Sequence, residues 1–157
     1  MIKGVGLLLL LGAMQGSNSH TIHVTQAPKV KAEEGSTVTL NCSYSTSISV
    51  LSNRPWLEWH RHVLNGSKVS NTEGDFMGRV SKSTPEDFLS KKSADVTIHN
   101  VVQSDTGMFI CVVYIRIDNT NISSGHGNGT LLEITGNHVH SMCLVKDHSK
   151  CKLRMEI

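Results

Sequence analysis

The run Asp105-Thr106-Gly107-Met108-Phe109-Ile110-Cys111 ends at one of two widely separated cysteines, and the other is Cys42. Trp59 lies between the two cysteines in the sequence. This arrangement is typical of a sandwich of two β-sheets, in which a cystine bridges the layers and a buried indole packs against it. We therefore expect a Cys42–Cys111 disulfide with Trp59 in the core around it. Such a domain serves recognition, so the question becomes what it binds.

The first 19 residues have the composition of a secretory signal peptide. Lys3 is followed by an apolar run over residues 5–11 and then by Ser17-Asn18-Ser19, which favours cleavage after Ser19. The apolar run is too short to span a bilayer, which takes about 20 residues. A buried N-terminal helix is the alternative. Export would bring the cysteines into an oxidising compartment, where a disulfide persists.

Length and charge restrict what the remaining chain can be. The 15 Lys and Arg residues nearly balance the 13 Asp and Glu residues, and a signal peptide would remove only Lys3 from this balance. A chain so close to neutral lacks the clustered basic face that nucleic acids require, so we expect no nucleic-acid partner. The length after residue 19 suits one domain over residues 20–135 and a polar, disordered tail over 136–157 without a transmembrane helix.

Short stretches of alternating apolar and polar residues follow one another along the domain. Such alternation is the period of a half-buried β-strand, and no long stretch repeats with the helical period. Segments rich in Gly, Asn, Ser and Asp separate these stretches, as expected for turns. The pattern predicts an all-β sandwich with strands near residues 37–42, 57–59, 96–98, 109–115 and 132–134.

The segment between Trp59 and Val96 is longer than a seven-stranded sandwich needs. Two extra short strands, near residues 68–69 and 75–76, would use this length. Gly127-Asn128-Gly129-Thr130 resembles the bulge that opens the last strand of variable domains. Together with the cysteines and Trp59, these features resemble the immunoglobulin V-set family over residues 21–135. The resemblance implies an immunoglobulin-like V-type sandwich of two antiparallel sheets with one inter-sheet disulfide.

Within this family, three stretches look most like the activating receptors of natural killer cells. They are Gly78-Arg79-Val80, residues 94–101 and the segment from Gly127 to Leu131. The resemblance implies a monomeric or self-associating ectodomain that recognises a protein ligand on another cell. Receptors of this kind pair a basic transmembrane residue with a signalling adaptor. We expect such an adaptor to be a partner only of a longer, anchored form.

Two features near Cys111 concern the structure of the core. Phe109 occupies the position of the usual V-set tyrosine, so its ring can be buried but cannot donate the hydrogen bond of the tyrosine corner. Asp105 is expected to pair with Arg79, as V-set domains do, with Arg61 as the rival partner. We interpret Asp105 and Arg79 as structural residues.

The same alternation predicts a binding face. If Cys111 and Val113 point into the core, Ile110, Val112 and Tyr114 point outward. Leu131 of the last strand and Glu58, His60 and His62 of the Trp59 strand share that face. An apolar stripe with a polar rim is typical of a protein-binding site, although a homodimer seam or coverage by loops would also explain it. Trp56 is either packed under the preceding loop or an anchor for the ligand.

Two loops and four glycosylation motifs complete the candidate sites. The segments 45–54 and 117–126 correspond to recognition loops of variable domains, and the first contains Ile48, Val50 and Leu51. Loop placement favours modification at Asn65 and Asn121 over the other two motifs. The Asn-x-Ser/Thr motifs begin at Asn41, Asn65, Asn121 and Asn128.

The tail and the remaining function classes add alternatives. The tail could bind zinc, but its spacing matches no familiar zinc module, and its two cysteines could instead pair with each other or with another chain. No catalytic motif occurs, so we expect no enzyme, metal or cofactor. An antigen-receptor segment is disfavoured because the pairing glutamine is absent. The alternative to a receptor is a soluble decoy or adhesion protein. The chain is expected to be secreted or, in an anchored form, to lie at the cell surface. The tail residues that could bind zinc or form disulfides are His138, His140, Cys143, His148 and Cys151.

Overall fold

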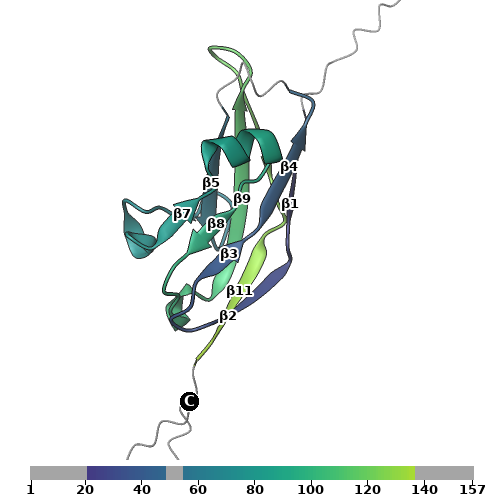
Figure 1. Cartoon of the computed structure of the whole chain (residues 1–157). Coiled ribbons are helices and arrows are strands. Elements are labelled where there is room, and N and C mark those ends of the chain that lie inside the picture. Colours follow the sequence, from purple (N-terminus) through teal and green to yellow (C-terminus); the bar gives the residue numbers. More distant parts are fainter. Residues whose placement is uncertain (1–20, 49–54, 137–157) are drawn as a thin grey trace, which may run out of the picture.

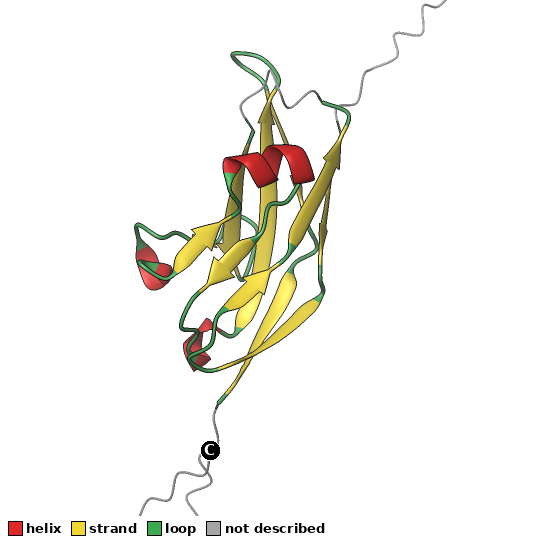
Figure 2. Cartoon of the chain, in the orientation of Figure 1, coloured by secondary structure: helices red, strands yellow, loops and turns green. Residues whose placement is uncertain are grey.

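The computed structural model describes residues 21–48 and 55–136, which form a two-layered β-sandwich (Figure 1). The predicted signal peptide and, apart from Gly136, the polar tail lie outside the described residues. Strands dominate the described part, and its helical segments η1 (Gly74–Phe76), η2 (Asp87–Lys91) and η3 (Gln103–Asp105) are short (Figure 2). No helix in residues 21–48 and 55–136 is long and apolar enough to cross a bilayer. The strands are β1 (Ile22–Gln26), β2 (Lys29–Glu33), β3 (Val38–Leu40), β4 (Cys42–Thr46), β5 (Trp56–Arg61), β6 (Ser67–Lys68), β7 (Val80–Lys82), β8 (Val96–Ile98), β9 (Gly107–Arg116), β10 (Ile122–His126) and β11 (Thr130–Thr135).

The strands divide into a back layer and a front layer. The back layer combines the pair β1–β4 with the sheet β3–β8–β7. The front layer has the order β2–β11–β9–β5–β6, and β10 also pairs with β9. All of these pairings are antiparallel except that of β2 with β11. The all-β V-type sandwich predicted from the sequence is therefore confirmed, with one parallel pair added at the edge of the front layer.

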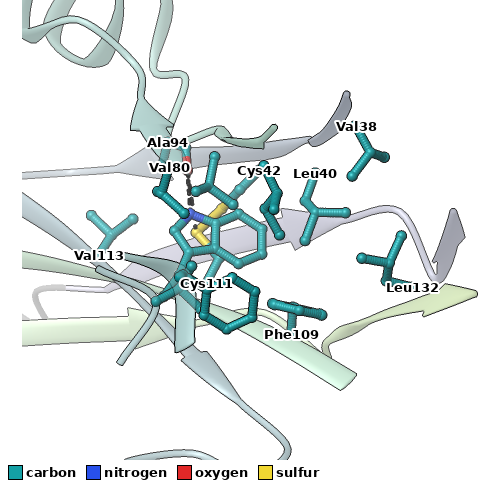
Figure 3. Packing of buried hydrophobic residues seen from close by; sticks show 14 of the residues in the cluster. Val38, Leu40, Cys42, Val80, Ala94, Phe109, Cys111, Val113 and Leu132 are labelled. Carbon is teal, nitrogen blue, oxygen red and sulfur yellow. Dashed lines mark hydrogen bonds between the residues drawn. A yellow bond between two sulfur atoms is a disulfide. The ribbon is translucent and has the colours of Figure 1, made fainter. Parts of the chain in front are cut away.

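The core forms where the inward positions of both layers meet (Figure 3). Cys42 on β4 and Cys111 on β9 are joined by a disulfide with a Cα–Cα distance of 6.5 Å, so the cystine bridges the two layers. Trp59 is 0% exposed, and its indole Nε1 donates a 2.8 Å hydrogen bond to the carbonyl oxygen of Ala94. That bond satisfies the one polar group of the indole, which would otherwise oppose its burial.

The segment between β5 and β7 differs from the prediction. The first extra strand is present as β6, but the second is replaced by η1 (Gly74–Phe76), a single 3-10 turn. Phe76 is buried and packs edge-on against Phe109, with ring centroids 5.8 Å apart. The guanidinium groups of Arg61 and Arg79 also approach its ring. The segment therefore buries Phe76 against Phe109 rather than adding a strand to the sheet edge.

The last strand is split around the predicted glycine bulge. β10 pairs with residues 112–116 of β9, and β11 pairs with residues 107–109. Residues 122–126, which we assigned to a loop, are thus a strand. Gly129 has a φ of +96°, and a Cβ there would lie 2.6 Å from Sδ of Met108. A side chain at this position would be strained by the positive φ and would displace Met108, so glycine is favoured where the two halves of the strand change register.

Gln26 ties β1 to the front layer and was not predicted from the sequence. Its side-chain amide donates to the carbonyl oxygen of Phe109 and to Thr130 Oγ1, both at 3.1 Å. Its side-chain oxygen accepts a 3.0 Å hydrogen bond from the backbone N–H of Cys111. Gln26 therefore holds the first strand beside the cystine.

Candidate functional site

The outer surface of the front layer, which we call the front face, carries an apolar stripe along β9. Ile110 and Tyr114 alternate with core residues on this strand and are half-buried rather than covered. Leu131 joins them from β11 and is likewise half-buried. Met108 has the same parity, is half-buried and pairs with Leu131, so it extends the stripe. The sequence analysis missed Met108, although strand alternation could have identified it.

Trp56 lies at the start of β5, opposite Tyr114. The two rings are stacked, with centroids 5.0 Å apart and an interplanar angle of 9°. Stacked aromatic pairs of this kind contribute beyond the area they bury. Because Trp56 and Tyr114 are both half-buried, this stack fixes two large rings at the surface of the front face. The preceding segment, residues 49–54, lies outside the described residues.

Two residues predicted to be available on this face are covered by their neighbours. Val112 is 3% exposed because it is short and sits between Glu58 on β5 and His126 on β10. His60 is also 3% exposed, since it lies between Ile110 and Lys68. Both side chains have outward parity, but neither is open to direct contact with a ligand. Val112 and His60 therefore support the predicted face from beneath.

Glu58 is the centre of a polar cluster beside the aromatic stack. Its Oε1 accepts a 2.9 Å hydrogen bond from Nζ of Lys68, and its Oε2 lies 3.4 Å from Nε2 of His60. The hydrogen bond to Glu58 raises the pKa of Lys68. Burial raises the pKa of the Tyr114 hydroxyl, and the charge of Glu58 adds to that increase. The cluster thus holds its charges in fixed positions next to the apolar stripe.

The edges of the front face are rich in cations. Lys29 and Lys31 on β2 share Glu133, and their side chains are more exposed than its carboxylate. Lys68, at the opposite edge, is likewise more exposed than Glu58. Arg116 is exposed at the end of β9 and has no ion-pair partner among residues 21–48 and 55–136. Cations therefore lie at both edges of the face, together with the exposed Glu33 on β2.

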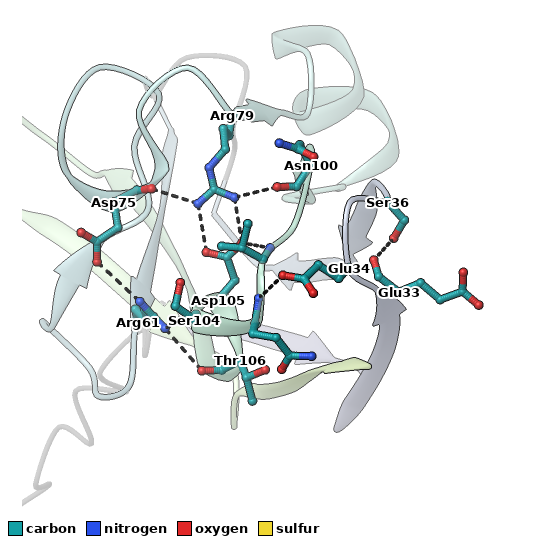
Figure 4. Close-up of polar contacts among 12 residues, drawn as sticks. Glu33, Glu34, Ser36, Arg61, Asp75, Arg79, Asn100, Ser104, Asp105 and Thr106 are labelled. Atoms are coloured by element: carbon teal, nitrogen blue, oxygen red, sulfur yellow. Dashed lines mark hydrogen bonds and ion pairs between the residues drawn. The ribbon is translucent and has the colours of Figure 1, made fainter. Parts of the chain in front are cut away.

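The base of the domain contains the predicted pair of Arg79 and Asp105 (Figure 4). The two side chains form a bidentate contact, with N···O distances of 2.7 and 2.9 Å, and Asp105 also accepts the backbone N–H of Val102. Burial by itself would raise the pKa of Asp105, but the hydrogen bonds from Arg79 and Val102 outweigh it and lower that pKa. Arg61, the rival partner, instead donates to the carbonyl oxygens of Ser104 and Thr106.

The segment before β10 is ordered by an aspartate. Asp118 accepts hydrogen bonds from both the backbone and the side chain of Thr120 and of Asn121. The hydrogen bond from the Asn121 side chain is the largest contribution that lowers the pKa of Asp118. In the other predicted loop, Ile48 is buried. The four asparagines of the glycosylation motifs, Asn41, Asn65, Asn121 and Asn128, are all exposed; their modification stays a prediction.

No cluster of three or more potential metal ligands occurs within residues 21–48 and 55–136. The tail residues His138, His140, Cys143, His148 and Cys151 lie outside that part of the chain. The geometry on the front face, with aromatic and aliphatic side chains beside fixed charges, suits the binding of another protein surface.

Comparison with known proteins agrees with this description. The model of the immunoglobulin V-set domain matches residues 25–135. Natural cytotoxicity triggering receptor 3 of Rattus norvegicus is 28% identical over 82% of this chain, and that of Homo sapiens is 29% identical over 84%. The chain covers 65% and 64% of these two receptors, respectively.

The receptor of the same name from Macaca fascicularis is 30% identical over 82% of this chain and 70% of its own length. Triggering receptor expressed on myeloid cells 3 of Mus musculus matches a shorter stretch, at 33% identity over 57% of this chain and half of its own length. The predicted resemblance to natural killer receptors is thereby confirmed. The chain belongs to the immunoglobulin V-set family and is similar, within that family, to natural cytotoxicity triggering receptor 3.

Proposed function

We propose that this chain is an extracellular recognition module whose front face binds a protein on another cell. The observation that carries the proposal is the stripe of Ile110, Tyr114 and Leu131 with Trp56 stacked at one end. Large aromatic residues dominate the energy of many protein interfaces, and here two of them are already stacked on each other in the unbound chain. Similarity to receptors named for triggering cytotoxicity supports a role in immune recognition.

The partner should match both the shape and the charge of the face. An apolar projection would cover the stripe, and acidic side chains around it would meet Lys29, Lys68 and Arg116. Such complementarity speeds association and selects among partners. Self-association through the same face is the competing use. Signalling through a membrane adaptor is proposed only for a longer, anchored form, and secretion or surface display follows from the signal-peptide prediction.

The experiment is a binding screen with the full chain, secreted from mammalian cells and tetramerised. The tetramer is tested against an array of recombinant cell-surface ectodomains, and each ectodomain that binds is then measured with variants. Ile110→Arg places a charge in the centre of the stripe and is expected to weaken binding at least about 100-fold, since a hot-spot residue is replaced. Unchanged binding by Ile110→Arg would exclude the front face.

The matched control is Thr39→Arg on the outer surface of the back layer. Thr39 is exposed on β3 and hydrogen-bonds only Thr97 across the sheet, so the same charge is added at a comparable strand position. This variant should bind as the unaltered chain does. Sedimentation of the unbound chain decides whether the face instead joins two copies, because a stable dimer lost on Ile110→Arg would favour self-association.

A further inference from the structure

The outer surface of the back layer carries a polar depression at the break between β3 and β4. The depression is open to solvent and has a volume of about 440 Å³, within the range of roughly 300–1,000 Å³ for small-molecule sites. Its lining comes from the end of β1, from residues 41–43 and from residues 91–95, which precede β8. The outward-facing residues that line it are Thr25, Asn41, Ser43, Lys91, Ser93 and Asp95.

Strand register places these side chains in two neighbouring rows. Thr25 lies opposite Ser43 in the β1–β4 pair, and Ser43 lies opposite Ser93 in an isolated bridge. The β3–β8 register, continued by one residue, brings Asn41 opposite Asp95. Residues two apart along a strand point to the same side. Three hydroxyl groups therefore lie in one row across the depression, and an amide and a carboxylate lie in the next.

The polar groups of the depression keep hydrogen-bonding capacity beyond the bonds they already make. Asp95 accepts the backbone N–H of Cys42 at 2.6 Å on one carboxylate oxygen and the hydroxyl of Ser93 at 2.9 Å on the other. Each carboxylate oxygen can accept two hydrogen bonds, so each has a further site. Lys91 contacts Asp87 at 2.7 Å, which uses one of its three N–H donors. The depression thus offers both acceptors and donors to a ligand.

This combination suits a carbohydrate better than an ion. Sugar hydroxyls donate and accept hydrogen bonds, as the lining groups do. Asp95 has no ion-pair partner among residues 21–48 and 55–136. The same residues include no cluster of three or more potential metal ligands, so one carboxylate flanked by hydroxyl groups and a lysine is not a cation site. The chemistry of the depression favours a neutral, hydroxyl-rich ligand.

The source of such a ligand is attached at the rim. Asn41 is exposed, lines the depression and begins the motif Asn41-Cys42-Ser43. We propose that the first sugars of an N-linked glycan on Asn41 occupy this depression and hold the glycan against the back layer. Transfer from a lipid diphosphate oligosaccharide donor forms the bond between Nδ2 of Asn41 and C1 of the first sugar. It breaks the bond from C1 to the diphosphate oxygen and releases one Nδ2 proton.

The covalent attachment makes weak contacts sufficient for docking. A sugar linked to Asn41 loses little translational freedom when it settles into the depression, because the contact is intramolecular. Asn65 provides the contrast, since it is exposed between β5 and β6 and does not line the depression. A docked glycan would cover the junction of β1 and β4 on the back layer. This inference does not depend on the proposed function, which concerns the opposite layer.

The first test measures removal of the glycan from the folded full chain, secreted from mammalian cells. Peptide-N-glycosidase F converts a glycosylated asparagine to aspartate, and peptide mapping in ¹⁸O water gives the rate at Asn41. Thr25→Arg fills the depression from β1 and leaves the motif intact. It should speed release at Asn41 about tenfold, the factor supplied by one or two net hydrogen bonds. His23→Arg is the matched control, because His23 is exposed on the same side of β1 and lies outside the depression.

Three results of the first test decide the matter. Faster release in Thr25→Arg, with the rate in His23→Arg unchanged, supports the docked glycan. An unmodified Asn41 would overturn the proposal. Equal rates in the unaltered chain and Thr25→Arg would overturn it as well, because a glycan that extends into solvent does not respond to a filled depression.

The second test locates the sugar directly. The full chain is made in cells that attach only high-mannose glycans and is trimmed with endoglycosidase H, which leaves one N-acetylglucosamine on each modified asparagine. The NMR signals of the sugar on Asn41 are those that vanish in Asn41→Gln. Nuclear Overhauser effects are expected from this sugar to protons of Thr25 and Ser93. A sugar that shows none to any lining residue would overturn the proposal, even where Thr25→Arg fails to fold.

A third measurement separates the chain's own glycan from a sugar of another molecule. The full-length Asn41→Gln variant is applied to an array of free glycans. No binding is expected, since an untethered sugar lacks the advantage of intramolecular contact. Binding that Thr25→Arg abolishes would assign the depression to a foreign sugar and overturn the proposal. The proposed function fails separately, on unchanged binding of an ectodomain by Ile110→Arg.

Discussion

The outer surfaces of the two layers differ in chemistry although both are built from the same strand pattern. On the back layer, Thr39 and Thr97 hydrogen-bond each other at 2.8 Å, and His99 bridges Thr37 and Ser81. Small polar side chains there satisfy one another across the strands. The front face instead holds a stacked pair of rings and a stripe of aliphatic side chains. The difference favours the front face, rather than the outer surface of the back layer, as the proposed contact with another protein.

Both surfaces rest on one core, so damage to the core should affect them equally. The largest effect is expected from Asp105→Ala, which leaves Arg79 without its carboxylate at the base of the domain. Breaking a buried ion pair by removing one partner costs about 3 kcal/mol of the free energy of unfolding. Chemical denaturation measures this loss. Affinity per folded molecule should not change, and a selective loss of binding would show that Asp105 acts in recognition.

Asp75→Ala is the control for that experiment. Asp75 is exposed, and its side chain only approaches Arg61, at 3.5 Å. Exposed pairs contribute about 0–1 kcal/mol, so the unfolding free energy should hardly move. A loss as large as that of Asp105→Ala would mean that Arg61, rather than Arg79, is the main support of the base.

Tyr114→Ala should show directly whether binding uses the front face rather than the outer surface of the back layer. Removing Tyr114 also removes the support on which Trp56 is stacked, so binding to an ectodomain found in the screen should fall by about 2 kcal/mol, or 30-fold. Surface plasmon resonance measures the change. Thr97→Ala on the back layer serves as the control and should bind normally. Equal losses in the two variants would contradict the assignment of the front face.

Acid should weaken the core through Asp105. Its pKa is lower in the folded protein than the value of about 3.9 for a free aspartate. The folded state therefore gains stability from the ionised carboxylate above about pH 3.9, and loses that gain as the pH falls toward the lower, folded-state pKa. Urea midpoints measured between pH 6 and 2 should show this decline. Asp105→Asn should flatten it, and an identical slope in this variant would contradict the account.

The smallest effect is expected at the edge of the front face. Lys29→Ala removes a partly exposed pair with Glu133 and should lower the unfolding free energy by about 0.5 kcal/mol or less. Its association rate with an acidic ectodomain should fall modestly at low salt and match the unaltered chain at high salt, where charges are screened. Stopped-flow measurements at two salt concentrations distinguish these outcomes. A salt-independent change would argue against the proposed cationic rim.

The parts of the fold that depend on residue spacing and on strand alternation could be predicted from the sequence alone. The cystine between Cys42 and Cys111 and the buried Trp59 follow from spacing and alternation, because inward positions of a strand recur every second residue. The 3-10 turn η1 was mistaken for a strand, since only the tertiary packing of Phe76 between two arginines pulls that segment inward.

For the candidate site, alternation gave the direction of side chains but not their exposure. Ile110 and Tyr114 remain accessible, whereas Val112 and His60 are covered by residues on neighbouring strands. That coverage depends on strand register, which pairs Val112 with Glu58 and His126, and register is not visible in one sequence. The role of Gln26 was missed for the same reason, because its partners lie on strands distant in the chain.

Hydrogen exchange tests most directly whether binding uses the front layer and not the back layer. It is measured on the complex between the full chain and an ectodomain that binds it. Slower exchange is expected in β5, β9 and β11, and exchange in β3, β7 and β8 should be the same with and without the partner. Protection confined to β3, β7 and β8 would contradict the assignment of recognition to the front face.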